Sequence, residues 1–176
     1  MTKFMKFLLI LLFFSPQMAH SAPKLLNNYQ NINILAETLR NNPQPDKKMD
    51  FIQLYESEFV IGKLRIYSPS PYYDHNTPNA VKLMGSKANS VVYAYSGTKK
   101  RKLDLKQIVF VFLLDNQQGI DAINNVAGRL FEQISEKPSC DPLGCRWTTQ
   151  EFRVSIVQDP KMPVATVMIA ESNLFR

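Results

Sequence analysis

The stretch "LKQIVFVFLL" (residues 105–114) decides the fold, because every position from 108 onward is apolar. Successive side chains of a strand point to opposite faces of a sheet. The two faces would carry Ile108, Phe110, Phe112 and Leu114 on one side, and Val109, Val111 and Leu113 on the other. A strand that is apolar on both faces is typical of the covered centre of a sheet. We therefore expect a central strand with Phe110 and Phe112 in the core, beneath a helix.

The segments on either side of this strand predict two hairpins and a helix. "NSVVYAYS" (89–96) indicates a strand that "GTKKRKLD" (97–104) joins to the central one. "TQEFRVSIVQ" (149–158) and "PVATVMIAE" (163–171) indicate two more strands, joined by a turn over residues 159–162. Between the hairpins, Asp115 and Gln118 have capping-box spacing ahead of a helix over 119–136. One helix face would carry Ile120, Ile123, Val126, Ala127, Leu130, Phe131 and Ile134.

The first part of the mature chain predicts another helix and one or two strands. Apolar residues recur at helical spacing from Leu25 to Leu39, and residues 41–43 (Asn-Asn-Pro) end the pattern. "EFVIGKLRIY" (58–67) indicates a strand, while residues 51–55 fit either a strand or a helical turn. Residues 22–176 should thus form one α+β domain. We expect a mainly antiparallel sheet of about five strands, with two amphipathic helices packed on it.

Residues 1–21 have the pattern of a secretory signal peptide. Lys3 and Lys6 precede the apolar run "FLLILLFF" (7–14), and Ala19 and Ser21 supply small residues for cleavage. The run is shorter than the roughly 20 residues that span a membrane, and no second long apolar run follows. We expect an exported chain, periplasmic or secreted, without a transmembrane segment after cleavage. Cleavage would remove two lysines and no acid, which lowers the net charge from +6 to +4.

Both cysteines lie in "SCDPLGCRWTT" (139–149), and they predict a disulfide. Four residues separate Cys140 from Cys145, whereas a thioredoxin-type redox pair has two. A structural zinc site needs four ligands, and His75 is the one histidine beyond residue 21. Export into an oxidising compartment favours the disulfide, which we expect to join a helix end to the next strand. A loop this short predicts about 2 kcal/mol of stabilisation.

Two segments are candidate binding sites. Lys99, Lys100, Arg101 and Lys102 form the densest charge run, which favours an anionic partner; the alternative is a solvated turn whose lysines discourage edge-to-edge pairing. Tyr67, Tyr72 and Tyr73 flank or occupy a proline-rich loop (68–79) that is long enough to suggest a role. Their rings would bind a peptide or a sugar, or else pack on the sheet and tether the loop.

No catalytic, metal or cofactor site follows from the sequence. Motifs for nucleotide binding, zinc hydrolysis and a serine nucleophile are absent, and Asp74 and His75 are neighbours in a loop. Export argues against a nucleic-acid partner. The leading hypothesis is a non-catalytic interaction module of the bacterial cell envelope or exterior, which binds an envelope protein or an anionic polymer. The alternative is an envelope-polymer hydrolase with a carboxylate pair, because such a pair has no sequence signature.

Overall fold

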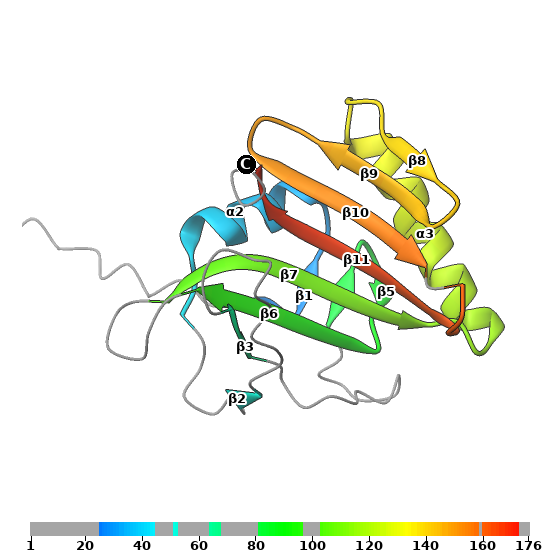
Figure 1. Cartoon of the computed structure of the whole chain (residues 1–176), viewed down its shortest axis with the longest axis horizontal. Coiled ribbons are helices and arrows are strands. Elements are labelled where there is room, and N and C mark those ends of the chain that lie inside the picture. Colours follow the sequence, from blue (N-terminus) through cyan, green and yellow to red (C-terminus); the bar gives the residue numbers. More distant parts are fainter. Residues whose placement is uncertain are drawn as a thin grey trace, which may run out of the picture.

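The computed structural model describes residues 25–44, 51–52, 64–67, 81–96, 103–158 and 160–172. Its main feature is an antiparallel sheet with the strand order β2-β3-β6-β7-β11-β10-β9-β8 (Figure 1). In chain order the strands are β2 (Phe51–Ile52), β3 (Leu64–Tyr67), β6 (Ser90–Ser96), β7 (Asp104–Leu113), β8 (Ser139–Asp141), β9 (Gly144–Thr148), β10 (Phe152–Gln158) and β11 (Val164–Glu171). The predicted hairpins β6–β7 and β10–β11 are both present.

Two helices and a small second sheet complete the described part. The helices are α2 (Ile32–Asn41) and α3 (Gln117–Gln133), and both lie on the same face of the large sheet (Figure 1). The small sheet joins β1 (Asn28–Tyr29), β4 (Lys82–Leu83) and β5 (Ser86–Lys87). The expected α+β class is therefore confirmed, with a larger sheet than the five strands expected.

Strand β7 is central, as its sequence predicts. It pairs with β6 on one side and with β11 on the other. Ile108, Phe110 and Phe112 are fully buried in the core on the helix side. On the opposite face, Val109 and Val111 are only half-buried. The sequence predicted that both faces of β7 would be covered. In the described part of the chain, however, α2 and α3 both pack on the same face.

Helix α3 carries the chain across the sheet. It leaves the central strand β7 and delivers the chain to the edge strand β8, from which β9, β10 and β11 return strand by strand to β7. The helix cap is Asn116, whose Oδ1 accepts a hydrogen bond from the backbone N of Gly119 at 3.0 Å, rather than Asp115. Ile123, Val126 and Leu130 are buried as expected.

Helix α2 begins later than its sequence pattern suggests. The pattern starts at Leu25, but the helix starts at Ile32, with Asn31 as its N-cap. The preceding Tyr29 belongs to β1, and its side chain is fully buried. A buried tyrosine fits the apolar spacing of a helix equally well, which explains the error. The helix ends where expected, at Asn41, and is followed by the C-cap Asn42, whose φ of 47° lies in the left-handed region.

Side-chain amides fasten the end of α2 to β7. Gln44 accepts a hydrogen bond from the backbone N of Leu103 at 3.0 Å and donates one to the Leu103 carbonyl at 2.8 Å. Asn42 Oδ1 accepts from the backbone N of Leu105 at 2.7 Å. These side-chain amides thus form hydrogen bonds with the extended backbone of residues 103–105, as the backbone of a neighbouring strand would.

Candidate functional site

Most of the predicted binding residues lie outside the described residues. This holds for Tyr72, Tyr73, Lys99, Lys100, Arg101 and Lys102, and also for His75. Tyr67 is the last residue of β3, and its backbone is paired with that of Tyr93 in β6. The basic run and the tyrosine loop therefore stay predictions.

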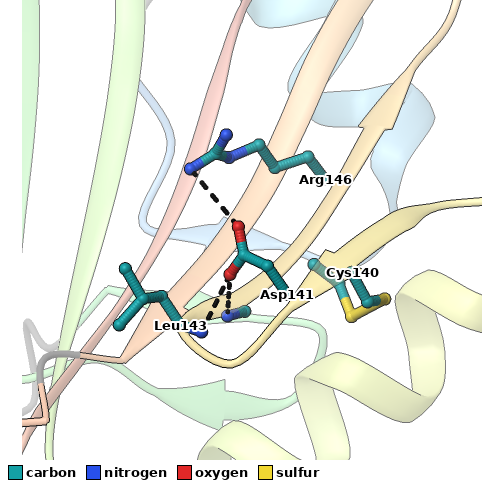
Figure 2. The surroundings of a disulfide bond; sticks show 6 residues. Cys140, Asp141, Leu143 and Arg146 are labelled. Atoms are coloured by element: carbon teal, nitrogen blue, oxygen red, sulfur yellow. Dashed lines mark hydrogen bonds and ion pairs between the residues drawn. A yellow bond between two sulfur atoms is a disulfide. The ribbon is translucent and has the colours of Figure 1, made fainter.

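The predicted disulfide is present between Cys140 and Cys145. The two residues face each other directly across the β8–β9 pair (Figure 2). The bond thus fastens two strands of one hairpin, rather than the end of α3 to the next strand. The sequence stretch was expected to be a turn, but only residues 142–143 fall between the strands. Both strands extend the sheet beyond β10. The turn-rich composition of this stretch did not predict them.

The β8–β9 turn is held by a carboxylate. Asp141 Oδ1 accepts hydrogen bonds from the backbone N of Leu143 at 2.8 Å and of Gly144 at 3.1 Å (Figure 2). Its other oxygen lies 4.0 Å from Arg146 Nη2. Gly144 has a φ of 152°, and a Cβ there would lie 1.8 Å from the carbonyl oxygen of Ile156. The close approach of the turn to β10 therefore requires glycine at position 144.

Three connections lie at one end of the sheet: the β7–α3 connection, the β8–β9 turn and the β10–β11 turn (Figure 1). A groove there is lined by the end of the β7–α3 connection, by α3 and by the β10–β11 turn. The backbone N of Leu114 donates to the carbonyl of Pro163 at 2.7 Å, and the backbone N of Gln158 donates to that of Leu143 at 2.8 Å. The groove, called the end groove below, has a volume of about 470 Å³. Its lining consists of Leu114, Ile120, Ile123, Asn124, Gln158, Pro160, Lys161, Met162 and Pro163.

Two exposed apolar side chains line the end groove. Within the described ranges, five large apolar residues are exposed: Leu26, Ile120, Phe131, Leu143 and Met162. Ile120 is 38% exposed and Met162 55% exposed, and both line the groove. Leu143, 44% exposed, is hydrogen-bonded through its carbonyl to the groove residue Gln158. Such a gathering of exposed apolar surface is typical of a binding site.

The sequence pattern did not identify this site. It placed Ile120 and Phe131 on the buried face of the helix, but both are exposed. Phe131, 53% exposed, sits over the edge of the buried Trp147, with ring centroids 5.0 Å apart. Met162 offered a signal, since it is an apolar residue in a turn between Pro160 and Pro163. The closeness of that turn to α3 follows only from the path of α3 across the sheet.

Two other grooves are more polar. One lies between the β4–β5 turn and α3, has a volume of about 360 Å³ and is lined in part by Lys87 and Asp121. The other, about 240 Å³, is lined in part by Glu136 and Glu151. Both glutamates are exposed, and Glu151 lies 3.9 Å from Arg40. They are the carboxylates that the hydrolase hypothesis would use.

The described part of the chain holds no cluster of three or more His, Cys, Asp or Glu side chains fit to bind a metal ion. None of its helices combines the length and the apolar character needed to cross a membrane.

Comparison with protein-family models, with curated proteins and with solved structures finds no match for this chain.

Proposed function

We propose that this protein is an exported, non-catalytic interaction module of the bacterial cell envelope or exterior. The observation that carries the proposal is the end groove, where Ile120 and Met162 expose apolar surface to solvent. Exposed apolar side chains that line a groove are a common feature of binding sites, where a partner covers them. The basic run 99–102 and the tyrosine loop at residues 72–73 are proposed as further contacts with an envelope protein or an anionic polymer.

Export is supported by two independent features. Residues 1–21 have the order of a signal peptide, with lysines, an apolar run and small residues in turn. The disulfide between Cys140 and Cys145 belongs in an oxidising compartment. The test is to express the full chain in a bacterium, fractionate the cells and sequence the N-terminus of the product. A chain that stays in the cytoplasm with Met1 intact would contradict the proposal.

The hydrolase is the second candidate, and Glu136 and Glu151 are the observation in its favour, because they line one groove. A general acid in a glycosidase lies in a buried, apolar site, whereas both glutamates are exposed. The test is to incubate the oxidised protein with purified envelope polymer and to follow released reducing ends. Release that is lost in both Glu136→Gln and Glu151→Gln would establish the enzyme and overturn the non-catalytic proposal.

A further inference from the structure

We propose that α3 packs antiparallel against α3 of a second copy of this chain, through one line of side chains on the helix. That line, called the α3 seam below, consists of Ile120, Asn124, Ala127 and Phe131. The inference goes beyond the proposed function and does not depend on it, because the seam joins identical copies. Three properties of the seam lead to it: its spacing, the order of its side-chain sizes and its open centre.

The spacing of the seam is that of a coiled coil. Its residues follow one another at intervals of four, three and four, which keeps them on one side of a helix. Ile120 is 38% exposed and Phe131 53% exposed, and Asn124 is exposed between them. The side chains that α3 buries against the sheet lie about a quarter of a turn away. They are Ile123, Val126 and Leu130. The helix therefore has a second apolar line, which packing within one copy leaves partly exposed.

The order of side-chain sizes selects an antiparallel pair. Large apolar residues stand at both ends of the seam, and the smaller Asn124 and Ala127 stand in the middle. With a two-fold axis midway between these two, Ile120 faces Phe131 of the other copy at both ends, and each Asn124 faces an Ala127. Helices that cross are closest at the crossing point, so small residues belong at the axis and large ones beyond it. A parallel pair would set Phe131 against Phe131 beside a layer of two alanines, which no single distance between the helices fits.

The centre of the seam leaves room for a close approach. Gly128 lies beside it and is exposed, and a Cβ added there would contact nothing within 4 Å beyond the backbone of the helix itself. The Asn124 side chain has no hydrogen-bond partner among the described residues. In the pair, the two Asn124 side chains would lie on either side of the axis. Each carboxamide has a donor and an acceptor, so each can donate to the other. A polar residue at such a position also fixes the register of a helix pair.

Phe131 is held in place before the copies meet. Its ring lies against the buried Trp147, with ring centroids 5.0 Å apart and ring planes at 74°. A side chain that is already ordered loses little conformational freedom on association. The helix has 17 residues and is about 25 Å long, so the seam contact is smaller than a standard interface. We expect a dimer that dissociates on dilution and grows no further, since both copies use the same patch.

The experiment measures self-association of the purified, oxidised protein by sedimentation equilibrium over a hundredfold range of concentration. We expect a monomer–dimer equilibrium. Ile120→Lys and Phe131→Glu should each raise the dissociation constant of the dimer at least tenfold, because each places a charge opposite an apolar side chain. Leu26→Glu and Met162→Glu are the matched controls, exposed apolar residues outside the seam, and should change the constant less than twofold.

A mixture of the two seam variants tests the antiparallel pairing. When one copy carries Ile120→Lys and the other Phe131→Glu, the introduced charges of opposite sign face each other at one end of the seam. The original contact between Ile120 and Phe131 remains at the other end. The mixed dimer should therefore have a dissociation constant at least tenfold below that of either variant with itself.

Three results would overturn the inference. They are a protein that stays monomeric throughout the range, a dimer that neither seam variant weakens, and a mixture that associates no better than the single variants. Urea denaturation checks that each variant is folded. If Phe131→Glu unfolds through its lost contact with Trp147, the comparison of Ile120→Lys with Met162→Glu decides the question. Both residues line the end groove, and only Ile120 belongs to the seam, so equal effects of these two variants would contradict the assignment.

Discussion

The hydroxyl oxygens of Tyr29 and Tyr93 lie 3.3 Å apart in the core. Tyr29 comes from β1 of the small sheet and Tyr93 from β6 of the large sheet. Both oxygens also contact the backbone of Leu26: Tyr29 accepts from its N at 3.3 Å, and Tyr93 donates to its carbonyl at 3.5 Å. The pair therefore ties the start of the described chain to the sheet through one buried and two part-buried hydrogen bonds.

The first prediction follows from the burial of Tyr29. Burial raises the pKa of Tyr29 above its ordinary value of 10.0, although its hydrogen bonds to Tyr93 and Leu26 act in the opposite direction. The folded state then keeps a proton that the unfolded state releases. The contribution to stability is complete below pH 10.0 and is lost as the pH rises through the folded pKa. Urea unfolding at several pH values between 8 and 11 should show that the free energy of unfolding falls as the pH rises. The fall should be less steep for Tyr29→Phe than for the parent protein. An equally steep fall in both proteins would contradict the prediction.

The second prediction compares neighbouring residues on opposite faces of β7. Phe112 is fully buried beneath the helices, so Phe112→Ala should lower the free energy of unfolding by about 3–5 kcal/mol. Val111 is half-buried on the other face, so Val111→Ala should cost only about 1 kcal/mol. Urea denaturation of both variants makes the comparison. Similar losses at the two positions would mean that both faces are equally covered.

The third prediction concerns the disulfide. The denatured, unreduced protein should show no thiol with Ellman's reagent, because Cys140 and Cys145 are bonded to each other. The double variant Cys140→Ser, Cys145→Ser should lose about 2 kcal/mol, since the closed loop is short. Its circular dichroism spectrum should match that of the parent, because the β9–β10 pairing remains. Two titratable thiols in the untreated protein would contradict the prediction.

The fourth prediction separates two roles of Asn42. The residue ends α2 in the left-handed region, and its side chain bonds the backbone N of Leu105 and the carboxylate of Asp104. Asn42→Gly keeps the backbone conformation and loses the hydrogen bonds, at about 1–2 kcal/mol. Asn42→Ala adds the cost of a left-handed alanine, about 1 kcal/mol more. Thermal or urea unfolding decides the matter, and an alanine variant as stable as the glycine variant would rule out the conformational role.

The fifth prediction tests the basic run and the tyrosine loop against a partner isolated from envelope extracts. Neutralising Lys99, Lys100, Arg101 and Lys102 together should weaken binding at low salt, and much less above about 0.15 M, where charges are screened over about 8 Å. The Tyr72→Ala, Tyr73→Ala double variant should weaken binding at both salt concentrations, since aromatic contacts do not depend on salt. Unchanged affinity for both variants would mean that neither segment contacts the partner.

Local patterns predicted much of this fold, and long-range placement explains what they missed. The apolar run in residues 108–114 and the turns after residues 96 and 158 are local properties, so β7 and both hairpins could be predicted. Tyr29 satisfies helical spacing, and only its pairing with β4 makes it a strand residue. In the same way, Pro142 and Gly144 indicate a turn, and nothing local shows that residues on both sides of it extend the sheet. The end groove escaped prediction for this reason, because it joins turns that are distant in sequence.

The short strand β8 has a consequence for self-assembly. Copies of a protein that pair through their sheet edges grow into a filament only when both edges of each copy can pair. Each added copy must then leave one edge free for the next copy. β8 offers three residues, and Pro138 just before them has no N–H to donate. The bond between Cys140 and Cys145 holds this edge in a single register. Two copies joined through the opposite edge would leave only the β8 edge free at each end. Because β8 is too short to pair well with another strand, fibril growth would stop at two copies.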